Sequence, residues 1–584
     1  MAACAYRSRL VRLVIVLSAL AALLAGCDLP WQAKPSDMAK DQTLKMVWSI
    51  GIDQPDPAFS ADPGLIQLDN LLYDGLVTID RNGHLEPWGA ASWTVSPDGL
   101  TYTFTLRPHQ RFSDGTPVIA SDYAWSIDRA AHACHGSRVF YELAAIEGAA
   151  QLNESDCGDP SSQPMLATLV GRSILPDDSA NTLTIQLAQP AGYFLATLAT
   201  SASMALERRV VDERIQYDSS NYGADAAFVA SLSTGVTGQG GSGMFYLAKS
   251  AVSAVNNPGS LTLKPNPYWW GIAAGKKPNL SEIAISTSSS DATYSLFYGD
   301  PTVAFSSVLA ENQPPAHFAG QPYYHAQPAT AVRALLFSWS TPPFDDLNAR
   351  KAFCLAINRD QFNQQVYQGA MLPNWHLVPQ GMDSYNPSLK GLDGAPVMGN
   401  VTLAKHYWQL YLAAHHQQAP LITIDFGSLG SPSYLESSVW LRTAWQQTLG
   451  VTTVIDRNEW GMGPGWEHSR QIAQFSSGDD EYVDPQTIFS DFTWYVTNVP
   501  LAPAVDVPAA ATLLQQADEL MDMRQRTPLY QQAEQVLIDN VSLCPLFQVV
   551  NHYALRTWVK GGFVEDGRGI VPNDAWVTGY IAKH

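Results

Sequence analysis

The chain has 584 residues, with 54 Asp and Glu against 34 Lys and Arg, and therefore a formal net charge of −20. Hydrophobic residues make up 46% and charged residues only 15%, which predicts a folded chain of several domains rather than a disordered one. The acidic balance argues against nucleic acid as a partner, because phosphate binding needs clustered Lys and Arg. It argues equally against electrostatic docking on anionic lipid.

Residues 1–26 are typical of a secretory signal peptide. They hold three arginines and no acid, followed by a largely apolar run over 13–24 that is too short to span a membrane. The run ends at Cys27 in the sequence LAGC, which resembles the lipobox of bacterial lipoproteins. We therefore expect lipidation of Cys27, with a plain secretory signal as the alternative. Asp28 resembles a signal for retention at the inner membrane, and the polar residues 27–43 predict a tether.

Four other cysteines remain after removal of the signal peptide, and exported cysteines can oxidise. Cys134 and Cys157 form the natural first pair, because a bridge closing about 24 residues contributes on the order of 3 kcal/mol in the chain-entropy model. Cys354 lies in a helical pattern and Cys544 at the start of a strand. For these two, a disulfide and a pair of buried free thiols both remain open.

The periodicity of the first half predicts the following elements. We expect strands from residue 44 and over 101–106 and 182–187, a hairpin around Asn82-Gly83, and helices over 65–73, 122–133 (capped by Ser121 or Asp122) and 194–204. The second half predicts strands over 244–249, 422–426 and 451–456, and helices over 346–369, 401–417, 435–449 and 509–540. This alternation implies α/β layering, and the early patch of strands indicates a β-rich subdomain.

No motif for catalysis stands out. The glycine-rich run 238–243 fits G-x-G-x-x-G, but a strand pattern follows it where a dinucleotide fingerprint needs a helix. His406, His415 and His416 lie on a polar helix face, which favours a solvated surface over a metal site. Without a nucleophile, metal or phosphate motif, we expect neither an enzyme nor a cofactor.

One acidic segment has two interpretations. The sequence GDDEYVDP at 478–485 places four carboxylates between an apolar–polar strand pattern and an aromatic segment. It predicts either a solvated acidic loop, with calcium as a possible ligand, or a carboxylate that holds a cationic group in an aromatic-lined cleft.

Several longer segments together resemble one family, the extracytoplasmic solute-binding proteins (family 5) of ABC peptide importers. The similar segments are LLYDGLV (71–77), WTVSPDGLTYTFTLR (93–107), FSDGTPV (112–118), NPYW (266–269), PFDD (343–346), RKA (350–352), AINRD (356–360) and CPLF (544–547). The resemblance covers roughly residues 44–584.

The resemblance implies an α/β fold of the periplasmic-binding-protein type, with two lobes joined by hinge strands and an extra β-rich subdomain. The expected divisions are a lipoprotein signal peptide (1–26), a tether (27–43), the first lobe (44–78, 201–330 and 546–584), its inserted subdomain (79–200) and the second lobe (331–545).

The resemblance also implies a ligand site. In the family, an acid ahead of an Asp/Glu-Pro pair holds the α-ammonium group of the peptide. Its match by spacing is Glu481, with Asp480 as the nearest alternative. The strand that pairs with the peptide backbone matches Phe475, Ser476, Ser477 and Gly478. This chain departs from the family where Gly478 and Phe475 replace a Trp and an Arg, and where Asp479 replaces a Cys.

The function implied by the resemblance is a lipid-anchored receptor, expected to be monomeric and to lie in the periplasm on the outer face of the inner membrane. It would capture oligopeptides and deliver them to the transmembrane subunits of an ABC permease, which work with a cytoplasmic ATPase. The alternative is a receptor of the same superfamily for a nickel chelate, an oligosaccharide or a muropeptide.

Overall fold

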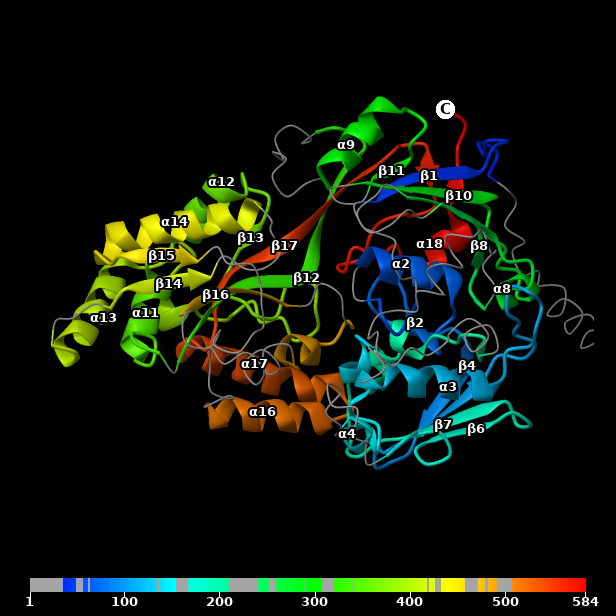
Figure 1. The fold of residues 1–584 in the computed structure, drawn as a ribbon, viewed down its shortest axis with the longest axis horizontal. Helices are drawn as coiled ribbons and strands as arrows, with labels where there is room; N and C mark the ends of the chain where they lie inside the picture. Colours follow the sequence, from blue (N-terminus) through cyan, green and yellow to red (C-terminus); the bar gives the residue numbers. More distant parts are fainter. Residues whose placement is uncertain are drawn as a thin grey trace, which may run out of the picture.

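The computed structural model describes residues 35–48, 56–60, 63–133, 137–153, 166–208, 240–251, 259–288, 290–306, 320–339, 341–416, 420–425, 432–456, 471–477, 482–490 and 507–584. Within these ranges, no helix combines the length and apolar character needed to cross a membrane. The chain forms two α/β lobes, seen left and right in Figure 1, as the sequence predicts.

One mixed sheet runs through both lobes in the order β15-β14-β16-β12-β17-β11-β1-β10-β9-β8, with β13 beside β17. The strands are β1 (Thr43–Trp48), β8 (Phe245–Ala251), β9 (Ser260–Pro265), β10 (Glu282–Thr287), β11 (Phe305–Ser306), β12 (Tyr324–Phe337), β13 (Leu372–Pro373), β14 (Ile422–Asp425), β15 (Thr453–Asp456), β16 (Ile472–Ser477) and β17 (Cys544–Leu555). The long strands β12 and β17 cross from one lobe to the other (Figure 1).

The first lobe surrounds β1, β8, β9, β10 and β11. One face of β1 buries Leu44 and Met46 in a core with the tryptophans of residues 269–270 and Trp576. On the other face Val47 packs against Phe297. The helices and short strands of this lobe are α2 (Pro63–Leu72), α8 (Trp270–Ala273), α9 (Ser290–Gly299), α18 (Asn573–Thr578), β18 (Val559–Lys560) and β19 (Tyr580–Ile581).

A β-rich subdomain is inserted in the first lobe. Its four-stranded antiparallel sheet has the order β4-β5-β7-β6, next to the two-stranded pair β2-β3. Its elements are β2 (Val77–Ile79), β3 (Leu85–Pro87), β4 (Ala90–Val95), β5 (Thr101–Leu106), α3 (Ala120–Ala130), η2 (Phe140–Leu143), α4 (Ala149–Leu152), β6 (Ile174–Asp177), β7 (Thr182–Gln186), α5 (Phe194–Thr197) and η3 (Ser201–Ser203). Alternate residues of β5, among them Tyr102 and Phe104, are buried in a separate core.

The second lobe packs helices around β14, β15 and β16. They are α11 (Leu347–Leu355), α12 (Arg359–Val366), η4 (Leu392–Gly394), α13 (Val401–Ala414), α14 (Pro432–Leu449), α16 (Pro508–Glu519) and α17 (Met523–Asp539). Cys354 of α11 and Cys544 of β17 form a disulfide with an S–S distance of 2.04 Å, which decides between the two states that the sequence leaves open. The Cys134–Cys157 pair lies outside the described residues and stays a prediction, as do the domain boundaries.

Local differences from the expected elements have simple causes. The helix expected over 346–369 is two helices, because the side chain of Asn358 accepts a hydrogen bond from Gln361 N and begins α12. Helix α3 begins earlier than expected, at Ala120, so neither Ser121 nor Asp122 is its N-cap residue. Instead, Ile119 N donates to the Asp122 carboxylate at 2.9 Å.

The glycine-rich run serves close packing. A Cβ on Gly241 would lie 2.3 Å from Leu72 O, and one on Gly243 would lie 2.5 Å from Leu72 C. Gly243 N donates to Leu72 O at 2.9 Å. Glycine is therefore required here so that the chain can pass the end of α2.

Candidate functional site

The strand expected to pair with a ligand is β16, which lies in the second lobe beside the lobe-crossing strand β12. It pairs antiparallel with β12 from Phe337↔Ile472 to Val332↔Ser477. Its other neighbour, β14, pairs with it only at Ile424↔Ile472. Among the described residues, no strand pairs with this second edge of β16 beyond Ile472.

The expected site residues fall on both sides of the end of this strand. The backbone of Phe475, Ser476 and Ser477 lies in β16, opposite Ala334, Arg333 and Val332 of β12. Gly478, Asp480 and Glu481 lie outside the described residues, as does the lipidation site Cys27.

The last carboxylate of the acidic segment, Asp484, is described and is not part of a solvated loop. Arg526 of α17 donates from Nη1 and Nη2 to its two carboxylate oxygens, each at 2.7 Å. Both side chains are buried, with 5% and 1% of their surface exposed. A fork-to-fork ion pair of this kind fixes the orientation as well as the position of both groups.

Two further polar groups extend this ion pair. Arg526 Nη2 also donates to the hydroxyl of Tyr530 at 2.6 Å, and that hydroxyl donates to Asp518 Oδ1 at 2.6 Å. Burial lowers the pKa of Arg526, but the Asp484 carboxylate and Tyr530 outweigh it, so that the pKa is raised and the guanidinium stays charged. Burial raises the pKa of Asp518 to about 7, although the hydrogen bond from Tyr530 and the charge of Arg526 both act to lower it.

The same place is where the second lobe contacts the inserted subdomain. Tyr482 stacks on Tyr193 at 6.2 Å between ring centroids and 15° between planes. Val483 packs against the subdomain core. Gly192 N donates to Asp518 O at 2.8 Å. We call this contact the clasp and define it by Gly192 and Tyr193 of the subdomain and Tyr482, Val483 and Asp518 of the second lobe.

The clasp has room for no side chain at Gly192, since a Cβ there would lie 2.0 Å from Leu520 O. Next to it, the Tyr102 hydroxyl of β5 lies 3.9 Å from the sulfur of Met521, in the turn between α16 and α17. The fold therefore holds residues 482–484, the described part of the acidic segment, between α17 and a loop of the subdomain.

Sequence reasoning missed the partners of Asp484. Asp484 and Arg526 are 42 residues apart, and no local pattern joins them. One partial signal exists: Arg526 and Tyr530 are four residues apart on α17 and therefore share a helix face, and that face is buried.

The described part of the site combines the end of strand β16, a buried ion pair and stacked aromatic rings. A strand edge of this kind can bind an extended chain by backbone hydrogen bonds. The part of the chain that the structure describes contains no cluster of three or more His, Cys, Asp or Glu residues that could hold a metal ion.

The family described as "Bacterial extracellular solute-binding proteins, family 5 Middle" matches residues 84–492. The periplasmic murein peptide-binding protein MppA of Escherichia coli is 24% identical over 97% of this chain and 98% of the relative. The oligopeptide-binding protein OppA of Bacillus subtilis is 23% identical over 94% of each chain.

Solved structures agree with the fold. The murein tripeptide-binding protein MppA of Escherichia coli matches with a TM-score of 0.71 at 22% identity, over 94% of this chain and all of that one. Haemophilus influenzae OppA, in complex with the peptide RPPGFSPFR, matches with a TM-score of 0.71 at 18% identity over the same shares.

Proposed function

Because the chain belongs to family 5 of the bacterial extracellular solute-binding proteins, we propose that it captures oligopeptides and delivers them to the permease of an ABC-type importer. The observation that carries this proposal is the edge of β16, which no described strand covers beyond Ile472. An extended peptide adds to such an edge through main-chain hydrogen bonds, which give affinity without reading side chains. Relatives named as peptide-binding proteins over nearly the whole chain support the same ligand class.

The proposed ligand residues are the backbone of Phe475, Ser476, Ser477 and Gly478 and one acid for the peptide ammonium group. Asp484 already has a buried guanidinium as its partner, which leaves the earlier acids of the segment for the ligand. We assign the ammonium group to Glu481, with Asp480 as the alternative.

A murein peptide is the second candidate ligand, and the similarity to the murein peptide-binding protein of Escherichia coli favours it. Both candidates offer a free backbone to the same strand edge. A nickel chelate or an oligosaccharide offers none, so that the edge of β16 gives no support to either.

The proposal places the protein in the periplasm as a monomer, anchored to the inner membrane through a lipid on Cys27, without a cofactor or enzymatic activity. The relatives named as periplasmic support the compartment. Fatty-acid labelling that is lost in Cys27→Ser tests the anchor, and labelling that persists in this variant refutes it.

Native mass spectrometry of protein purified from cells tests the ligand class. A ladder of peptide masses supports oligopeptide capture, and one discrete muropeptide mass supports the second candidate. A discrete non-peptide mass contradicts both.

Calorimetry tests the assignment of the ammonium group. Glu481→Gln keeps the shape of the side chain and removes its charge, so it should weaken binding of free-amine peptides at least about tenfold, or roughly 1.4 kcal/mol. N-acetylated peptides should bind the wild type weakly and barely respond to the substitution. Asp480→Asn is the matched control: if it carries the whole effect, the assignment moves by one residue. If neither variant changes affinity and both peptide forms bind alike, the ammonium site lies elsewhere.

A further inference from the structure

The N-terminal segment of the described chain is fastened to the C-terminus. Lys583 N donates to Asp37 O at 2.7 Å, and Ala39 N donates to Ile581 O at 2.8 Å. The Gln42 amide exchanges two hydrogen bonds of 2.9 Å with the backbone of Ile581. The chain therefore leaves the folded protein at a fixed point, beside β1 and the C-terminus in Figure 1.

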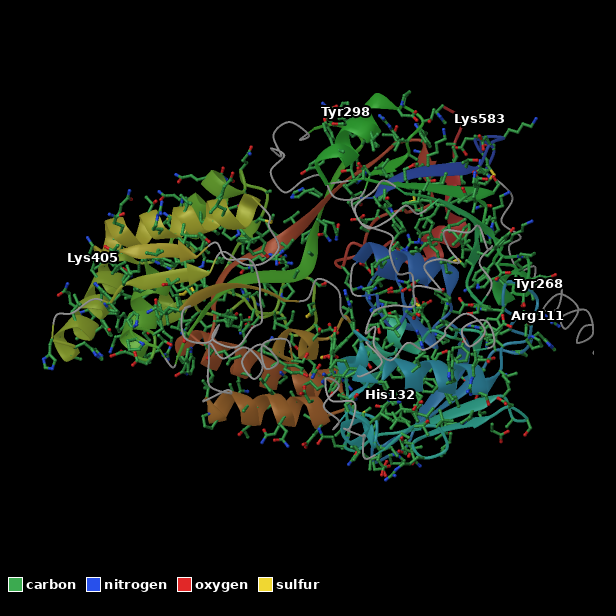
Figure 2. The ribbon with its side chains drawn as sticks, in the orientation of Figure 1. Arg111, His132, Tyr268, Tyr298, Lys405 and Lys583 are labelled. Atoms are coloured by element: carbon green, nitrogen blue, oxygen red, sulfur yellow. A yellow bond between two sulfur atoms is a disulfide. The ribbon has the colours of Figure 1, made fainter. Side chains whose placement is uncertain are left out.

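The length of chain before this point limits how far the protein can lie from a membrane. Pro35 lies eight positions after Cys27, and a fully extended chain over eight Cα–Cα steps spans at most about 29 Å. This step rests on the lipid anchor of the proposed function. Figure 2 shows Lys583 at the same end of the long axis as Tyr268 and Arg111, whereas Lys405 of the second lobe lies at the opposite end. A lipid on Cys27 consequently brings the first lobe to the bilayer and leaves the second lobe remote.

Five exposed lysines lie on segments that adjoin the two chain ends. We call their set the tether edge: Lys40, Lys264, Lys276, Lys277 and Lys583, all exposed. Lys264 follows Leu263 of β9, which pairs with Ile283 of β10, and the preceding Glu282 pairs with Thr43 of β1. The loop that carries Lys276 and Lys277 is tied to both chain ends, because Ser281 N donates to Gln42 O at 3.0 Å and Asn279 Nδ2 to Thr578 O at 3.2 Å.

The charge of the tether edge differs from that of the whole chain. In residues 35–42, 260–287 and 580–584, these five lysines stand against Asp37, Asp41 and Glu282, a net charge of +2 in a chain of −20. Charges on the far lobe are screened over a Debye length of about 8 Å at physiological salt, so a surface in contact with the edge meets mainly the lysines. Tyr268, with 47% of its surface exposed, adds a ring of the kind that suits the headgroup region.

We propose that the tether edge is the surface through which the anchored receptor rests on the bilayer, with anionic phospholipid headgroups as its partner. The overall acidity keeps the rest of the protein off the membrane, and the tether holds the lysine-bearing end against it. The receptor then stands with its second lobe directed away from the lipid.

Energy transfer from the protein to a lipid-borne dye tests this orientation. Full-length lipidated protein carries a bio-orthogonal fluorophore at position 583 or 405 and is reconstituted into vesicles of phosphatidylcholine, with or without 30% phosphatidylglycerol. We expect strong transfer from position 583 and weak transfer from position 405. Transfer from 583 should rise about twofold with phosphatidylglycerol, and 1 M salt should abolish that rise.

A triple variant separates the lysines from the tether. Lys264→Gln, Lys276→Gln and Lys277→Gln together should remove the rise caused by phosphatidylglycerol and leave the transfer that the tether alone permits. The matched control replaces Lys390, Lys405 and Arg442 of the second lobe, all exposed, by Gln and should keep the full response.

Several outcomes overturn the proposal. These are equal transfer from both positions, transfer from 583 that ignores lipid charge and salt, and close contact that appears only when a permease is added. Protein that fails to float with the vesicles because Cys27 carries no lipid overturns both the anchor and this orientation. Loss of peptide capture leaves the energy transfer unchanged, so the two failures are distinguishable.

Discussion

The two lobes are joined at the hinge strands and at the clasp, and the two junctions are built differently. At the hinge, β12 and β17 pair from Tyr324↔Ala554 in the first lobe to Leu335↔Cys544 in the second. The pairing is interrupted between Pro328 and Val332. There the Gln548 side chain replaces the missing ladder, because its amide donates to Ala329 O at 2.7 Å and to Gln380 O at 2.9 Å.

At the clasp, in contrast, the described residues show one backbone hydrogen bond between the lobes, from Gly192 N to Asp518 O, together with stacked rings and apolar contacts. The polar groups beneath it, Arg526 with Asp484 and Tyr530 with Asp518, all belong to the second lobe. The clasp can therefore part without breaking the hydrogen bonds of either lobe, whereas parting the hinge would break a sheet. We expect lobe opening to occur at the clasp and bending to occur at the interrupted segment of β12.

The largest effect should come from removing the cation beneath the clasp. Arg526→Met leaves the buried Asp484 carboxylate without a counter-charge, with the hydrogen bond from Gln486 N still in place, and this costs about 3–5 kcal/mol. Denaturant unfolding measures this loss. Arg524→Met is the matched control on the same helix, because the Arg524 side chain is 90% exposed and forms an exposed ion pair with Asp522, and it should change stability little. Equal effects of the two variants would contradict a buried ion pair.

The stability contributed by Asp518 of the clasp should depend on pH, whereas that of the uncharged Gln548 amide at the hinge should not. Burial raises the pKa of Asp518 to about 7, above its value of 3.8 in the unfolded chain. The folded state therefore binds this proton more tightly. The resulting stability is fully present below pH 3.8 and is lost as the pH rises through 7, at about 1.36 kcal/mol per unit and at most roughly 4 kcal/mol in all.

Asp518→Asn keeps the acceptor for Tyr530 and removes the titration. The variant should gain stability relative to the wild type as the pH rises from 4 to 8, and paired unfolding curves across this range measure the gain. The measurement must be the difference in unfolding free energy between the variant and the wild type. Burial also raises the pKa of Asp74 to about 7, so Asp74 adds the same pH trend to both proteins. A difference that does not vary with pH would refute the shift.

These two predictions rest on contacts that the sequence could not supply, although much of the fold could be predicted. Strand β5 coincides with the expected 101–106, because the strict alternation of threonines with apolar residues in TYTFTL leaves one interpretation. The hairpin at Gly83 follows from its turn residues, with φ at +83° at this glycine. Such local signals suffice to predict a strand or turn whose structure depends on its own residues alone.

The ends of the helices and the contacts of the site residues could not be predicted without knowledge of the tertiary structure. The helix expected over 509–540 is divided at residues 520–522, where Asp522 begins α17 by accepting from Arg524 N. The resemblance located the acidic segment, but the sequence placed Asp484 among its free acids, because its partner lies on a helix 42 residues away. The burial of Arg526 depends on how α17 packs, and no spacing in the chain encodes it.

A smaller effect should come from the hinge. Gln548→Leu removes the amide that bonds Ala329 O and both backbone groups of residue 380. Leaving such buried groups without partners costs about 1–3 kcal/mol. Hydrogen exchange should become faster in residues 329–332, and denaturant unfolding should shift accordingly. Gln535→Leu on α17, whose hydrogen bonds are exposed, is the matched control and should leave exchange in β12 unchanged.

The smallest effect should come from the stacked rings of the clasp, and it sharpens the comparison most. Tyr193→Ala removes one ring of the pair with Tyr482, a contact worth about 0.5–1.5 kcal/mol beyond its buried area. Tyr193 packs only at the margin of the subdomain core, so we expect the loss chiefly as a lower closed fraction. At about 1.4 kcal/mol per tenfold, the ratio of closed to open molecules should fall roughly two- to tenfold.

Energy transfer between labels on the second lobe and the subdomain measures this ratio with and without peptide. Tyr193→Phe keeps the ring and should behave as the wild type, while Tyr141→Ala, at an exposed ring of the same subdomain, controls for a general loss of aromatic surface. Peptide should restore closure in Tyr193→Ala at a higher concentration, because the ligand must supply the free energy that the rings no longer give. If Tyr193→Ala leaves closure unchanged while Gln548→Leu alters it, the lobes are held by their hinge alone. The clasp would then be a passive contact rather than the junction that opens.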